Sequence, residues 1–167
     1  AVACNGNGNK KIQDGAIAGR QELYMAFKHM ALSGLIPGAY SGSSVLTNFE
    51  STAGLNVPKS KLSKGEWNVD YSGAWYAQTP AASGWAGTDP LLVSKHRLTI
   101  GSHRGNVNSV NEGELFTTVE ASSIDTKIDD GIPYKGQVVG VLGMVAATNC
   151  ITGSGASAVY TKSQSGA

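Results

Sequence analysis

The chain has 167 residues, of which 41% are hydrophobic and 15% charged, and its formal net charge is +1. This length allows one domain with a hydrophobic core and is too short to expect two, so residues 1–167 are predicted to form a single domain. A charge this close to zero excludes a field that would by itself recruit nucleic acid or an anionic membrane. The 22 glycines and the low charge are typical of an extracellular, loop-rich protein rather than of a cytosolic enzyme.

The first predicted helix covers residues 19–33. Apolar residues recur there at helical intervals, and Gly34 with the following Pro37–Gly38 turn ends the helix. His29 lies beside the apolar stripe, where a packed or capping histidine is expected rather than a catalytic one. The stripe consists of Leu23, Ala26, Phe27, Met30 and Ala31.

Residues 43–95 are predicted to be largely irregular, with short strands at 45–49, 67–71 and 74–77. Alternation along the second of these strands places Trp67, Val69 and Tyr71 on one side. We expect the large aromatic side chains of this region to replace a thin aliphatic core under long loops. The alternative is an exposed platform for sugar rings or a neighbouring subunit. The candidates for that platform are Trp67, Tyr71, Trp75, Tyr76 and Trp85.

A strand at 96–101, a polar loop at 102–113 and a second helix follow in that order. His103 and Arg104 lie in the loop, where solvation is expected. Thr117 and Glu120 have the S/T-x-x-E spacing of a capping box, which predicts the start of the helix. Apolar residues then recur on one face, which predicts the buried side of this helix. These residues are Leu115, Phe116, Val119, Ile124 and Ile128.

The second helix is predicted to end in a tight turn. Gly131 supplies the left-handed residue that commonly closes a helix, and Pro133 prevents its continuation. The run 138–147 is apolar, rich in β-branched residues and nearly uncharged, which predicts a buried strand. A last short strand is expected at 158–161, before a Ser/Gly tail.

Three aspartates, Asp125, Asp129 and Asp130, lie at this turn. Because the helix macrodipole disfavours acids at a helix C-terminus, we expect each of them to have a local partner. The partners expected are Lys127, Lys135 or a backbone amide of the turn, and the alternative is a calcium ion shared by the three carboxylates. Paired carboxylates can raise one another's pKa in a cleft, but no nucleophile or base accompanies them in the sequence, so catalysis is not expected.

The sequence carries no spacing typical of an enzyme or a zinc site. His29, His96 and His103 form no metal-binding pattern, and there is no G-x-S-x-G elbow, P-loop or dinucleotide fingerprint. We therefore expect no enzyme, and no cofactor apart from the calcium alternative. Cys4 and Cys150 lie near opposite ends, without His or Cys neighbours at metal-ligand spacing, so one disulfide is preferred over two buried free thiols. A disulfide would imply export to an oxidising compartment.

Several stretches resemble proteins that bear a prepilin-type N-terminal cleavage and methylation signal. Residues 27–40, FKHMALSGLIPGAY, are similar to the family pattern WQHLALAGLIPGSY, with Phe27 in place of its Trp. The opening CNGNGN at 4–9 is similar to a pattern that follows the N-terminal helix of those chains. LTIG at 98–101, and Leu115 with residues 117–136, look like LT-x-x-x-A-x-x-IDTKIDDGxPxxG, which a strand and a late Cys follow. The order and approximate spacing agree over most of the chain.

The resemblance implies a pilin or pseudopilin of the type IV pilus and type II secretion superfamily. In that family an apolar N-terminal helix first anchors the subunit in the inner membrane and then packs in the core of a helical filament. An α+β head faces outward. The sequence lacks the signal and this helix, so it looks like the head alone, and we expect both to be encoded upstream of Ala1. The expected fold is α+β, with two short helices packed on a small antiparallel sheet and long Gly/Ser-rich loops.

The expected function is that of a structural subunit, a major or minor pilin or pseudopilin, of an extracellular or periplasmic filament. Such a chain is exported through the inner membrane, and its partners are other pilin subunits and the assembly machinery. No nucleic acid is expected, and the membrane is met only through the missing N-terminal helix. The alternative is an extracellular adhesin or carbohydrate-binding module, which binds a surface glycan through the aromatic region 67–85.

Overall fold

The computed structural model describes seven stretches of the chain and one isolated residue. These are residues 8–12, 20–43, 50–71, 95–103, 111, 113–140, 150–153 and 157–161. The elements, in chain order, are α1 (Arg20–Leu32), β1 (Gly65–Tyr71), β2 (His96–Ser102), α2 (Thr118–Ile128), β3 (Ile151–Thr152) and β4 (Val159–Tyr160). Two helices combined with small antiparallel sheets place the protein in the α+β class, as predicted.

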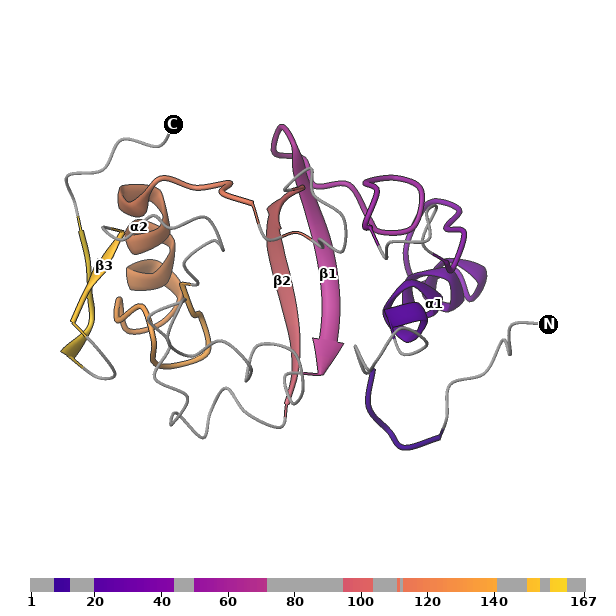
Figure 1. Cartoon of the computed structure of the whole chain (residues 1–167), viewed down its shortest axis with the longest axis horizontal. Helices are drawn as coiled ribbons and strands as arrows, with labels where there is room; N and C mark the ends of the chain where they lie inside the picture. Colours follow the sequence, from indigo (N-terminus) through magenta and orange to yellow (C-terminus); the bar gives the residue numbers. More distant parts are fainter. Residues whose placement is uncertain are drawn as a thin grey trace.

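The elements follow one another along the longest axis of the molecule (Figure 1). Helix α1 lies at one end, the β1–β2 pair in the middle, and α2 with β3 and β4 at the other end. Helix α1 contacts β1, and α2 contacts β4. The described residues therefore form two two-stranded sheets, each with one helix, and not the single small sheet that was predicted.

Helix α1 carries the apolar core of the first half. Leu23, Tyr24 and Phe27 are buried and pack with Val57 from the loop that precedes β1. The predicted helix and its end at Gly34 are confirmed, because Gly34 has a φ of +74° and its amide donates to Ala31 O at 3.0 Å. Partly buried side chains complete this cluster, namely Ile12, Met30, Ile36, Tyr40 and Val69.

His29 lies in the last turn of α1 and is exposed. The packed alternative for His29 is therefore wrong, and the capping alternative stays a prediction. On the same turn of the helix, Phe27 is buried and Met30 is half-buried against the apolar core. The His29 side chain, which lies between them in the sequence, points to solvent. A position in the last helical turn is one that a positively charged side chain favours.

The predicted strands at 67–71 and 96–101 are confirmed as β1 and β2. They pair antiparallel from Gly65 opposite Ser102 to Tyr71 opposite His96. On its other side β1 is covered by the preceding loop, since the Trp67 amide donates to Pro58 O at 2.9 Å. His103, which follows β2, is exposed, as predicted.

Helix α2 begins with the predicted capping box. The Glu120 amide donates to the Thr117 hydroxyl at 3.2 Å, and the Thr117 amide donates to the Glu120 carboxylate at 2.9 Å. The Glu120 carboxylate accepts hydrogen bonds from the Thr117 amide and the Thr117 hydroxyl, and these two bonds lower the pKa of Glu120 because they stabilise its charged form. The helix ends where predicted, with Gly131 at a φ of +74°.

The predicted buried face of α2 is wrong at two of its five residues, whereas Leu115, Phe116 and Ile124 are half-buried. Val119 is 48% exposed and Ile128 is 70% exposed, whereas the buried side chains of the helix are Thr118 and Asp125. The reason lies in polar contacts with the C-terminal strand. The Thr118 hydroxyl donates to Thr161 O at 2.8 Å, and Asp125 accepts from Tyr160, so the polar side of α2 is turned inward.

The last predicted strand is confirmed in part, because Val159–Tyr160 forms β4 and pairs with β3. The predicted buried strand at 138–147 lies mostly outside the described residues, and its first three residues, 138–140, form no strand. The predicted strands at 45–49 and 74–77, and Arg104, also lie outside the described residues. Among the helices that the structure describes, neither has the length and apolar character needed to cross a membrane.

The core of α1 provides a stability test with a matched control on the same helix. Leu23 is 0% exposed and Leu32 is 77% exposed. We expect Leu23→Ala to lower the free energy of unfolding by about 2–5 kcal/mol, because it removes buried contacts and leaves a cavity. Leu32→Ala should change it by no more than about 0.5 kcal/mol. Urea unfolding monitored by circular dichroism measures both, and equal losses would contradict this assignment of the core.

Candidate functional site

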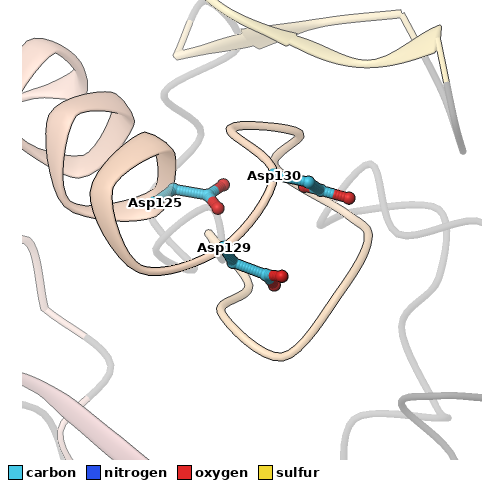
Figure 2. A group of neighbouring side chains, drawn as sticks. All are labelled: Asp125, Asp129 and Asp130. Atoms are coloured by element: carbon cyan, nitrogen blue, oxygen red, sulfur yellow. The ribbon is translucent and has the colours of Figure 1, made fainter.

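The three aspartates singled out in the sequence come together where α2 ends. Figure 2 shows Asp125 on the last turn of the helix and Asp129 and Asp130 on the loop that follows. One carboxylate oxygen from each lies within 4.8 Å of the others. Asp129 is the C-cap residue, and its amide donates to Asp125 O at 2.7 Å. The acidic turn, residues 125–138, is therefore the candidate functional site.

Asp125 is the buried member of the acidic turn, at 0% exposed. Its Oδ1 accepts the Gly131 amide at 3.1 Å, and its Oδ2 accepts the Tyr160 hydroxyl at 3.0 Å. Burial raises the pKa of Asp125, and the hydrogen bonds from Tyr160 and Gly131 act in the opposite direction. Burial and the neighbouring carboxylate raise the pKa of Tyr160 well above its ordinary value, so its hydroxyl stays protonated and donates.

Asp129 organises the loop after the helix. Its Oδ2 accepts the Val138 amide at 3.0 Å and also accepts the Gln137 amide. This carboxylate lies against Gly136, where a Cβ atom would collide with it. Gly136 also has a φ of +80°, a conformation that glycine adopts without strain. The loop from 129 to 138 is thus closed around one carboxylate.

Asp130 forms a smaller turn at the surface. Its Oδ1 accepts the Ile132 amide at 2.9 Å, and its Oδ2 lies 3.7 Å from Lys135 Nζ. The predicted local partners of the aspartates are therefore found in backbone amides and in Lys135. An exposed ion pair of this kind contributes little to stability.

The arrangement at the acidic turn fits hydrogen bonding better than an ion. Calcium takes six to eight oxygen ligands, and the three carboxylates offer one mutually close oxygen each. Both oxygens of Asp125 already accept hydrogen bonds, and one oxygen each of Asp129 and Asp130 accepts a backbone amide. The calcium hypothesis stays a prediction.

A buried polar layer on β1 was not predicted from the sequence. Glu66 is 1% exposed and Asn68 is 4% exposed, and the Ser51 hydroxyl donates to Glu66 Oε1. From the segment after β2, Asn111 Nδ2 donates to Glu66 O at 3.3 Å. Burial raises the pKa of Glu66, against the lowering effects of Ser51 and of the charge on His103. These two side chains lie on the face of β1 opposite to Trp67, Val69 and Tyr71, which the alternation places together on one side.

Two of the five candidate binding aromatics are described, and both are half-buried. Trp67 lies opposite Ile100 in the β1–β2 pair. The Tyr71 ring contacts the His96 ring edge-on, with centroids 5.4 Å apart, and Lys11 Nζ lies 4.7 Å from its centroid. Tyr71 is thus used in packing. Trp75, Tyr76 and Trp85 lie outside the described residues, so the sugar-binding platform stays a prediction.

Cys150 lies directly before β3 and is half-buried, with its carbonyl accepting the Thr161 amide at 2.9 Å. Burial, together with the negative charge of Glu114, raises the pKa of its thiol. A raised pKa lowers the thiolate fraction, so this cysteine is a weak nucleophile. The proposed partner, Cys4, lies outside the described residues, and the disulfide stays a prediction.

Comparisons of the chain with models of protein families, with curated proteins and with solved structures find no match in any of the three. The interpretation of the site therefore rests on its own geometry and on the motifs of the sequence. That geometry is one of helix capping, turn closure and a buried hydroxyl–carboxylate bond.

The buried bond between Tyr160 and Asp125 gives a test of the acidic turn. We expect Tyr160→Phe to lower the free energy of unfolding by about 1–3 kcal/mol, because Asp125 Oδ2 then loses its donor inside the protein. Tyr40→Phe is the matched control, since its hydroxyl donates to Pro37 O three residues away at the surface, at 3.1 Å. Thermal or urea unfolding of both variants measures the difference. A loss as large for Tyr40→Phe as for Tyr160→Phe would contradict the importance of the buried bond.

Glu66 gives a test of pH dependence. Because burial raises its pKa above the ordinary 4.5, the folded state binds this proton more tightly than the unfolded state. Its contribution to stability is full below the unfolded pKa and is lost as the pH rises through the folded pKa. We therefore expect Glu66→Gln to be more stable than wild type at pH 7 and about equal to it near pH 4.

The control for this experiment is Glu114→Gln, an exposed site. Urea unfolding of wild type and both variants at the two pH values measures the effect. If Glu66→Gln differed from wild type by the same amount at both pH values, the raised pKa of Glu66 would be refuted.

Proposed function

We propose that the chain is the head of a structural filament subunit, similar to the pilins and pseudopilins of the type IV pilus and type II secretion superfamily, and is not an enzyme. The observation that carries this proposal is that polar side chains of the motif at 117–136 form structural hydrogen bonds. Its polar side chains are occupied by a helix cap, a turn and a buried bond, as described for Glu120, Asp125 and Asp129. A filament subunit needs a rigid, complementary surface rather than reactive groups.

The acidic turn supports this proposal by its physical role. It joins the end of α2 to the C-terminal strand through Asp125 and Tyr160, and it closes the loop up to Val138 through Asp129. These bonds fix the shape of one end of the head. The IDTKIDDG stretch resembles a family of structural subunits, and in such a family we expect residues that maintain the shape of the head.

Exposed leucines at the end of α1 and just after it also agree with a subunit that packs against neighbours. Leu32 is 77% exposed and Leu35 is 75% exposed, and both lie in the stretch that is similar to the family pattern. Apolar side chains that stand close together on a surface are common at sites of protein–protein contact. In the proposed filament such side chains meet other subunits or the assembly machinery.

The proposal places the head outside the inner membrane, in the periplasm or at the cell surface, after export. The membrane would be met through an apolar helix that precedes Ala1, as in the family that the sequence resembles. Cys4 and Cys150 would then form their disulfide in an oxidising compartment. Glycan binding through the aromatic region would be an added property of a subunit at the filament tip.

Two measurements on the source organism test the proposal. The codons upstream of Ala1 are expected to encode a short basic leader and an apolar segment of about 20 residues. Surface filaments sheared from the cells, or pseudopilus fractions, are expected to contain this chain when analysed by mass spectrometry, with a strain that lacks the gene as control. An open reading frame with neither leader nor apolar segment, and a chain recovered as a free monomer, would overturn the proposal.

A further inference from the structure

The short segment at 11–12 is tied to the end of the β1–β2 pair by two backbone groups of Ile12. The Tyr71 amide donates to Ile12 O at 2.7 Å. The Ile12 amide donates to Nε2 of the His96 ring at 3.1 Å, across 84 positions of sequence. The Ile12 side chain packs against the core cluster of α1, so this attachment is not confined to the surface.

The two residues of the sheet that hold Ile12 are themselves paired. Tyr71 stands opposite His96 in the register, and their rings meet edge-on with centroids 5.4 Å apart. Lys11 Nζ lies 4.7 Å from the centroid of the Tyr71 ring, which is the arrangement of a cation–π contact. Together Lys11, Ile12, Tyr71 and His96 form what we call the His96 clasp.

The bond from the Ile12 amide requires a neutral imidazole. An imidazole accepts a hydrogen bond only at the nitrogen that carries no proton, and an imidazolium carries protons on both nitrogens. Protonation of His96 would therefore set two N–H donors, of Ile12 and of the ring, against each other. The other bond of Ile12, from the Tyr71 amide, involves no titratable group.

The charged residues near the His96 clasp are of both signs. Lys11 brings a positive charge from the N-terminal segment. On β2, Lys95 and Arg97 flank His96 in the sequence, and on β1 the residue opposite Arg97 is Asp70.

We propose that the His96 clasp is a pH-sensitive device in which the Ile12 amide is bound to His96 when the ring is neutral and is released when the ring is protonated. Histidine is the side chain whose charge ordinarily changes between pH 5 and 8. This inference does not depend on the proposed function, because it rests on contacts within the described part of the chain.

Hydrogen exchange of the Ile12 amide tests the clasp directly on the whole chain. In wild type we expect its protection factor, which is corrected for intrinsic exchange, to fall by at least about fivefold between pH 7.5 and pH 5.5, the factor for one net hydrogen bond. His96→Gln keeps a neutral acceptor at every pH, so its Ile12 amide should stay protected at both. His96→Ala removes the acceptor, so the amide should be unprotected at both.

His29→Gln is the matched control, since His29 is an exposed histidine on α1, and it should behave as wild type. Amides of α1 around Leu23 report whether each variant is folded. Constant protection of Ile12 in wild type at both pH values would overturn the proposal. So would wild-type protection in a folded His96→Ala variant, or a pH-dependent loss of protection in His96→Gln.

Discussion

The hydrogen bond between the Tyr160 hydroxyl and the Asp125 carboxylate determines how the second half of the molecule is assembled. A buried carboxylate is costly unless donors satisfy its oxygens, and Asp125 has two, Tyr160 and the Gly131 amide. To reach Tyr160 the helix must turn its polar side toward β4. The apolar residues Val119 and Ile128 are then left toward solvent. Two of the five apolar residues of the predicted face are thus exposed, while Leu115, Phe116 and Ile124 are half-buried.

The first half of the molecule also buries a carboxylate, that of Glu66, but it combines this carboxylate with an apolar core. An apolar cluster around Leu23 and Phe27 packs against Val69 of β1, whereas the other side of this strand holds the buried polar layer of Glu66 and Asn68. That layer is stable because Ser51 and Asn111 donate to Glu66. A chain with only 15% charged residues can bury a carboxylate in each half because each finds hydroxyl or amide donors close by.

The features that were predicted correctly from the sequence depend on residues only a few positions apart. The capping box of Thr117 and Glu120 depends on neighbouring backbone groups, so the residue types alone predict it. The same holds for the helix ends marked by Gly34 and Gly131. The buried face of α2 depends on Tyr160, which lies 35 positions from Asp125. No local pattern reports such a contact. For the same reason the polar layer on β1 escaped prediction, since the aromatic alternation on that strand is compatible with either face being the deeper one.

In the acidic turn, the shape of the loop requires particular residue types. Gly136 must lack a side chain because the Asp129 carboxylate occupies the space of a Cβ atom. That carboxylate in turn accepts the Val138 amide, and Gly131 presents its amide to Asp125 from a left-handed conformation. Each residue is needed by another in the same turn. The carboxylates of Asp125 and Asp129 thus hold the shape of the turn.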